Sequence, residues 1–199
     1  AEDIQKAIKD GNSNATLMVD AVMEEGTGTT YNVVGKIKGK SSDQQILVAG
    51  HYDKYWYGFQ DDSAAVALDF AVAKALIDSD YTPENDIVVV AHGAEEWGVT
   101  DSQFDYTTGA WGMMHEADLG WSGKTLALLN CELPAFEVEE NKLNIACVPE
   151  FGTLVNKMVS ESGLVATSGD VTVSEEAGSV NVMEDGVSYR WHGVPYLIN

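Results

Sequence analysis

Acidic residues and one histidine follow three apolar runs of this sequence, and a further acidic pair lies directly before a predicted helix. The residues are His51, Asp53, Asp61, Asp62, Glu95, Glu96 and Glu132. Imidazole nitrogen and carboxylate oxygen are donors that Zn²⁺ accepts in proteins. If the apolar runs are parallel strands, their carboxyl ends meet at one edge of a sheet, where open α/β sheets carry their functional residues. The pattern therefore predicts a metal site, and its donor types fit zinc.

Each part of this pattern, taken alone, also has a purely structural explanation. Asp61 and Asp62 fit an N-cap pair, because the helix dipole favours acidic residues there, and in isolation we favour the cap. Glu95 and Glu96 fit solvated surface charge, and Glu132 alone indicates nothing. The combination favours a site, since all these residues lie where a sheet would present one.

The elements that must position these residues alternate between strand and helix along the chain. We expect strands over residues 15–23, 30–39, 44–50, 86–93, 124–130, 143–148 and 195–199. We expect helices over residues 3–9, 64–78, 103–117 and 150–162, and we assign nothing to 164–182. Continuous apolar strands indicate a sheet covered on both faces. The sequence thus predicts a three-layer α/β/α sandwich with a mixed, mostly parallel sheet.

The predicted helix over residues 64–78 carries an apolar stripe at helical spacing. Its members are Val66, Phe70, Ala73 and Ile77. We expect these residues to form one apolar face of the helix, with Asp69 elsewhere.

Composition excludes several classes of protein. The 199 residues include 11 Lys and Arg against 32 Asp and Glu, a net charge of −21, which argues against nucleic-acid binding. The hydrophobic fraction of 45% is typical of a packed domain. No apolar run approaches the roughly 18–20 residues that cross a bilayer, so we expect no membrane-spanning segment. Cys131 and Cys147 form no disulfide framework and are either free thiols or one bridge.

Five segments in combination resemble the co-catalytic di-zinc metallopeptidase family, which includes secreted bacterial aminopeptidases and glutamate carboxypeptidases. They follow the family's order over roughly residues 30–199 and read ILVAGHYD, QDDSAAVAL, VVVAHGAEEWG, LALLNCEL and EDGVSYRWHGVP. The resemblance implies a zinc-exopeptidase fold, a peptide substrate and an extracellular or cell-surface location. It leaves the oligomeric state open.

The resemblance also implies the ligands of two zinc ions. His51 and Glu132 would bind the first zinc, Asp61 would bridge the two ions, and Glu96 would bind the second. Asp62 occupies a position that is not a ligand in the family.

Two further residues have implied roles in catalysis. Asp53 would lie behind His51 and orient its ring, as carboxylates commonly do for zinc-bound histidines. Glu95 would be the general base that takes a proton from the attacking water. The implied activity is that of a zinc-dependent exopeptidase, an aminopeptidase, that hydrolyses peptide bonds with a metal-activated water.

One element of the family pattern is missing from this sequence. The family's last ligand is a histidine beyond the strand that ends at Asn199. We expect His115 and His192 to be structural instead, and His92 to be an active-site wall or core residue. The second zinc would then lack one ligand. We therefore expect a single catalytic domain over residues 1–199, a fragment of a longer chain, that holds one zinc or none and has little activity. The alternatives are a catalytically incompetent relative that binds peptide and an interaction domain.

Overall fold

A seven-stranded mixed sheet forms the centre of the protein. The computed structural model describes residues 2–12, 14, 16–22, 26, 28–98, 106–117, 119–134, 142–163, 170–175 and 184–199. The strands are β1 (Val33–Ile37), β2 (Gln45–His51), β3 (Asp86–His92), β4 (Thr125–Asn130), β5 (Lys142–Cys147), β6 (Asp170–Ser174) and β7 (Tyr196–Ile198). Their order across the sheet is β1-β3-β2-β4-β7-β5-β6. Only the β1–β3 and β5–β7 pairs are antiparallel, so the predicted mixed, mostly parallel sheet is confirmed.

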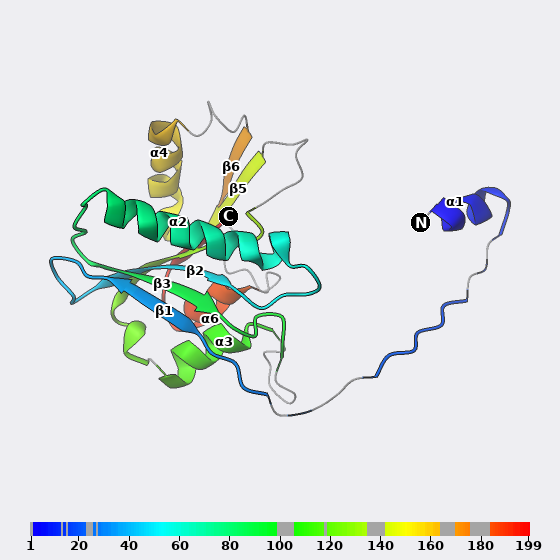
Figure 1. Ribbon diagram of the computed structural model, residues 1–199. Helices are drawn as coiled ribbons and strands as arrows, with labels where there is room; N and C mark the ends of the chain where they lie inside the picture. Colours follow the sequence, from blue (N-terminus) through cyan, green and yellow to red (C-terminus); the bar gives the residue numbers. More distant parts are fainter. Residues whose placement is uncertain are drawn as a thin grey trace.

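Helices cover both faces of this sheet (Figure 1). Within the described residues the α-helices are α1 (Glu2–Lys9), α2 (Ala64–Asp78), α3 (Thr108–Gly112), α4 (Gly152–Ser162) and α6 (Asp185–Trp191). Shorter helical turns are η1 (Phe59–Ser63), η2 (Met113–Ala117), η3 (Leu119–Trp121) and η4 (Pro149–Phe151). Helix α2 lies across one face, while α3 and α6 lie on the other, which confirms the three layers. No helix within the described ranges has the length and apolar character needed to cross a bilayer.

The core lies between the central strands and the helices α3 and α6. Its largest fully buried members include Leu47, Met114, Leu128, Tyr189 and Tyr196. Strands β2 and β3 are buried along nearly their whole length, which explains their continuous apolar sequences. Both cysteines are buried free thiols, so the bridge alternative is wrong.

The predicted strand over residues 15–23 is wrong for the residues that the structure describes. Residues 16–22 are extended but form no strand, and Leu17 and Met18 are 86% and 90% exposed. Figure 1 shows this segment and α1 on an arm that leaves the domain before β1. Alternating apolar residues give a segment the side-chain pattern of a strand. A strand also needs a neighbour whose backbone groups form hydrogen bonds with its own.

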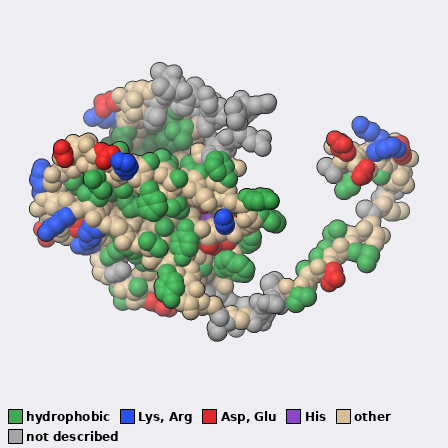
Figure 2. Space-filling model, viewed as in Figure 1, with side chains coloured by type: hydrophobic (Ala, Val, Ile, Leu, Met, Phe, Trp, Pro, Cys, Tyr) green, Lys and Arg blue, Asp and Glu red, His purple; other side chains and the backbone are tan. Residues whose placement is uncertain are grey.

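The most buried residues of α2 are not those of the apolar stripe. Ala65 and Asp69 are buried, whereas Phe70 and Ile77 are more than half exposed. Phe70, Ala73 and Ile77 border a groove of about 240 Å³ that β1 and β3 also line. Figure 2 shows hydrophobic side chains across this face. A small residue and a short acid allow α2 to approach β2 closely, so the bulky stripe is displaced to one side.

Two elements near the end of the chain were not expected. Strand β6 lies inside the unassigned stretch 164–182, and α6 occupies a segment expected only to precede the last strand. The helix expected over 103–117 is α3 followed by η2, while residues 103–105 lie outside the described residues. Helix α6 is short and has glycine as its second residue, which weakens its local helix preference. The valines and threonine of β6 favour a strand, but one only five residues long.

Burial of Asp69 gives the stability of the protein a pH dependence. Burial raises the pKa of Asp69 from 3.8 to about 7, and the nearby Cys131 thiol offsets this only partly. The folded state therefore favours the neutral acid, and this contribution to stability is lost as the pH rises through about 7. We expect Asp69→Asn to stabilise the protein by roughly 2–4 kcal/mol near pH 8 and by little near pH 4, measured by urea unfolding.

The control for this experiment is Asp78→Asn, which changes an exposed acid on the same helix. Equal pH profiles for Asp69→Asn and the unmodified protein would show that Asp69 is not the source of the dependence.

Candidate metal centre

The imidazole of His51 lies at the centre of the predicted site. His51 ends β2, is fully buried, and its Nε2 has no hydrogen-bond partner among the described residues. The distances from Nε2 to the nearest carboxylate oxygens are 3.1 Å for Asp61, 3.5 Å for Glu132, 3.9 Å for Asp62 and 3.9 Å for Glu95. One ring nitrogen thus faces four acids.

Sheet topology explains why these acids meet. Strand β2 lies between β3 and β4 and runs parallel to both, so all three strands end at the same edge. His51 is aligned with His92, the last residue of β3, and Glu95 and Glu96 follow three and four positions later. Asn130 ends β4, and Glu132 follows it by two positions. Asp61 enters from η1, the turn that leads into α2.

Two groups of possible ligand atoms share His51. One group combines His51 with Asp61 and Glu132, and the other combines it with Glu95 and Glu96. Within each group the ligand atoms lie within 4.8 Å of one another. The structure therefore brings the four predicted metal ligands into one cluster, and the division of roles between Glu95 and Glu96 stays a prediction.

Electrostatics of the cluster favour a bound cation. Burial by itself would lower the pKa of His51, but Asp53 and Glu132 oppose it and raise that pKa to about 12. Burial raises the pKa of both Asp62 and Glu95 to about 8. Carboxylates at such short separations repel one another when ionised, and a divalent ion would remove that penalty. The donor set and the unpartnered Nε2 fit zinc.

Asp53 holds the histidine and the adjacent glutamates in place. Its Oδ1 accepts a hydrogen bond from the backbone N–H of Glu95 at 2.9 Å, and its Oδ2 accepts one from Glu96 at 3.1 Å. The Nδ1 atom of His51 lies 3.0 Å from the backbone carbonyl oxygen of Asp53 and 3.5 Å from its Oδ1. A proton on Nδ1 leaves the lone pair of Nε2 directed at the carboxylates, which is the arrangement a metal ligand needs.

Asp62 lies behind the cluster and acts as an anchor. It is fully buried and accepts hydrogen bonds from the backbone N–H groups of His51, at 3.4 Å, and Leu133, at 3.3 Å. These contacts join the end of β2 to the loop that carries Glu132. They are consistent with the expectation that Asp62 is not a ligand.

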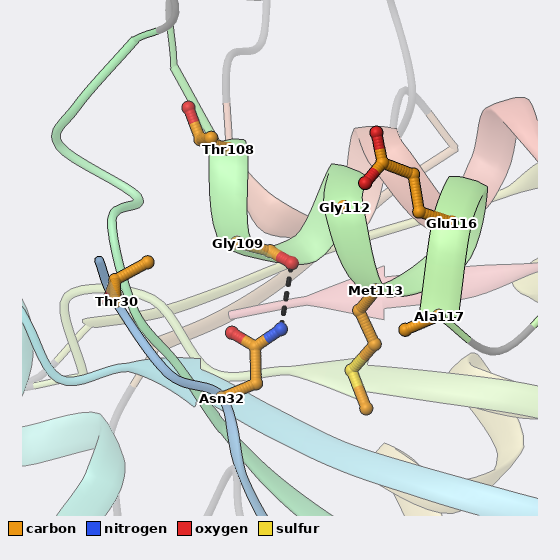
Figure 3. Close-up of a pocket in the computed structure, with 8 residues that line it drawn as sticks. All are labelled: Thr30, Asn32, Thr108, Gly109, Gly112, Met113, Glu116 and Ala117. Atoms are coloured by element: carbon orange, nitrogen blue, oxygen red, sulfur yellow. Dashed lines mark hydrogen bonds between the residues drawn. The ribbon is translucent and has the colours of Figure 1, made fainter. Parts of the chain in front are cut away.

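Asn32 is a positioning residue that the sequence did not reveal. Its Nδ2 donates to the carbonyl oxygen of Gly109 at 2.8 Å, as Figure 3 shows, and its Oδ1 accepts from the N–H of Gly93 at 3.1 Å. Asn32 thus fixes the start of the loop that carries the two glutamates. The same side chain lines a pocket of about 440 Å³ beside α3 and η2 (Figure 3).

Helix α6 contributes two buried acids that the sequence also did not assign. Glu184 accepts hydrogen bonds from Asn130, Gly186 and Tyr196, so it joins the end of β4 to the start of α6. Asp185 is fully buried, and neither of its oxygens has a hydrogen-bond partner among the described residues. Burial raises the pKa of Asp185 well above its ordinary value, and the charge of Glu95 adds to the effect.

We expect Asp53→Asn to weaken zinc binding. An amide keeps only one oxygen acceptor, so one of the two glutamate N–H groups would face an NH₂ donor instead. Loss of such a supporting contact reduces metal affinity by about 10–100-fold. A zinc titration against a competing chelator measures the change, with Asp43→Asn at an exposed position as the control. An unchanged affinity would show that Asp53 does not support the site.

The sequence of this chain is similar to those of known peptidases. Over 108 residues the chain is 33% identical to a probable leucine aminopeptidase 2 of Aspergillus oryzae, a match covering 52% of this chain and 21% of that protein. It is 31% identical over 91 residues to a glutamate carboxypeptidase 2 homolog of Caenorhabditis briggsae, a match that covers 43% of this chain and 12% of that protein. The matches thus span about a fifth or less of these relatives.

The fold has solved counterparts as well. A zinc aminopeptidase from Bacillus subtilis superposes with a TM-score of 0.62 at 15% identity, over 84% of this chain and 39% of that one. Peptidase family M28 matches residues 32–198, the whole span of the sheet. The chain therefore belongs to peptidase family M28.

Proposed function

We propose that this chain is the catalytic part of a zinc-dependent exopeptidase of the aminopeptidase type. Its membership of family M28 supports a peptidase, and the related leucine aminopeptidase supports the specificity. The observation that carries the proposal is the buried, unpartnered Nε2 of His51, which faces four carboxylates within 3.9 Å.

We assign the ligands from the first of the two groups and from the resemblance to the co-catalytic family. His51, Asp61 and Glu132 form the group that would hold one zinc. The resemblance implies that Asp61 and Glu96 would hold a second. Zinc, when bound, polarises the scissile carbonyl and makes water a stronger nucleophile at neutral pH. The Asp61 side chain is 49% exposed, so the cluster is open to solvent at this residue. A substrate carbonyl would approach from this side, and the same residues would orient it.

Glu95 is the proposed general base. Its side chain is 6% exposed, and its Oε2 lies 3.9 Å from the Nε2 of His51. From there its carboxylate would take a proton from the attacking water and return it to the leaving amine. Asp53 would act as a positioning residue, since it fixes the backbone of both glutamates.

Two features support action at the amino end of a peptide. The net charge of −21 and the partly exposed Asp61 favour a cationic α-amino group near the site. Trp56, Tyr57 and Phe59 are strongly exposed between His51 and the start of α2, where they could contact an apolar substrate side chain. We also propose an extracellular or cell-surface location, which the resemblance to secreted aminopeptidases implies.

The division of labour between the two glutamates is testable in the natural full-length protein. We expect Glu95→Gln to leave zinc content nearly unchanged and to lower peptide hydrolysis by at least about 10²-fold, the usual contribution of general acid–base catalysis. We expect Glu96→Gln to lower zinc content as well. Zinc analysis and hydrolysis of an aminoacyl amide measure both effects. Equal loss of metal in the two variants would contradict the assignment.

A second candidate function is peptide binding without cleavage. The observation that favours it is that the two possible ligand groups among the described residues share His51, so only one ion can bind that imidazole and the other is left with carboxylates. We expect the 199-residue chain to retain one equivalent of zinc after dialysis and to hydrolyse aminoacyl amides slowly, because carboxylates alone hold a second ion less tightly than an imidazole and two carboxylates hold the first. Two equivalents with rapid turnover would contradict this expectation and exclude the second candidate.

A further inference from the structure

A second pair of imidazoles meets outside the acidic cluster. His115 lies in η2, and His192 directly follows α6, so 77 residues separate them along the chain. The Nδ1 atom of His115 lies 3.4 Å from the Nε2 atom of His192. Neither residue belongs to the groups around His51. Sequence alone suggested two unrelated structural residues, but the fold brings their ring nitrogens together.

The protonation of His192 is fixed by its neighbours. Its Nδ1 lies 2.7 Å from the carbonyl oxygen of Ser188, which has no proton to give, so Nδ1 carries the proton and donates. In the neutral ring the lone pair is then on Nε2 and points at His115. Ser122 donates a hydrogen bond to the backbone carbonyl of His192 and holds it in place. A histidine whose other ring N–H is bonded to a backbone carbonyl is typical of metal ligands.

The distance between the two nitrogens also matches a shared metal. In the metal-free chain the 3.4 Å spacing is that of a long hydrogen bond between the two rings, and a bound ion would take the place of the shared proton. Zinc–nitrogen bonds of about 2.0–2.1 Å at a tetrahedral angle place two ligand nitrogens roughly 3.3–3.4 Å apart. The pair therefore has the spacing of two corners of a zinc tetrahedron.

The surroundings of the pair allow an ion to enter. The ring of Trp111 stacks on His115 with centroids 4.8 Å apart and an interplanar angle of 17°, and it lies 5.0 Å from the ring of His192. Trp111 thus restricts both imidazoles on one side. His115 is exposed and His192 is partly buried, so water can reach the remaining coordination positions. The net charge of −21 attracts cations to the whole surface.

We propose that His115 and His192 form a second metal site, which binds one Zn²⁺ or a similar late transition-metal ion through two imidazole nitrogens and water. Such an ion would link η2 to the end of α6, the helix whose other end carries the buried acids Glu184 and Asp185. Because the unfolded chain separates the two histidines, binding would stabilise the folded state. This site stands independently of the proposed peptidase activity.

The experiment follows the imidazole resonances of the chain by NMR during a Zn²⁺ titration. The sequence has four histidines, so each ring can be assigned by a single His→Gln variant. We expect the signals of His115 and His192 to move together with one common midpoint, separately from the signal of His51. Because His115 is exposed, we expect His115→Gln to fold normally. In this variant the midpoint of the His192 shift should require at least about 10-fold more zinc, since one of the two ligands is gone.

Glu116→Gln is the matched control, because Glu116 is exposed in the same helical turn and should leave the midpoint unchanged. His192→Gln provides the reciprocal test on the His115 signal, and circular dichroism shows that each variant is folded. A thermal shift with zinc that is smaller in His115→Gln than in Glu116→Gln would support the same site. Signals that move with different midpoints, or a His192 response that is the same in His115→Gln, would overturn the proposal.

Discussion

Mutual repulsion among acids around one buried imidazole is the constraint on which the rest of this structure depends. Four carboxylates lie within 3.9 Å of the Nε2 of His51, and those of Asp62 and Glu95 are buried with it. Low dielectric strengthens both their repulsion and their attraction to a cation. A fold that keeps these carboxylates together must tolerate the repulsion between them, and a bound divalent ion would turn that repulsion into attraction to the ion. The contacts of Asp53, Asp62 and Glu184 hold the acids near one another against that repulsion.

The sheet supplies the rigidity that this arrangement requires. Strand β2 lies between its parallel neighbours β3 and β4, so the loops that follow these two strands begin at the same edge of the sheet as His51. Each loop is then fastened by a hydrogen bond from a distant segment: Asn32 holds the loop after β3, and Glu184 holds the end of β4. The site is therefore built on strands and fixed by side chains that never touch the metal position, an arrangement that restricts ligand movement.

Sequence reasoning predicted the sheet class and the residues of the cluster because both depend on local patterns. Continuous apolar strands ending in acids or histidine are visible one strand at a time, and parallel topology then brings the ends together. Asn32, Asp185 and the pairing of His115 with His192 could not be predicted this way, since each depends on contacts between segments far apart in the chain. The burial of Asp69 in α2 could not be predicted for a related reason, because periodicity identifies an apolar face but not the neighbour against which each residue packs.

The central claim is that the acids around His51 bind zinc, and anomalous diffraction tests it most directly. Crystals grown with zinc would be measured on both sides of the zinc absorption edge. The account predicts an anomalous peak about 2.0–2.2 Å from the Nε2 of His51 and from carboxylate oxygens of Asp61 and Glu132. A protein that crystallises from saturating zinc with no anomalous density at His51 would contradict it.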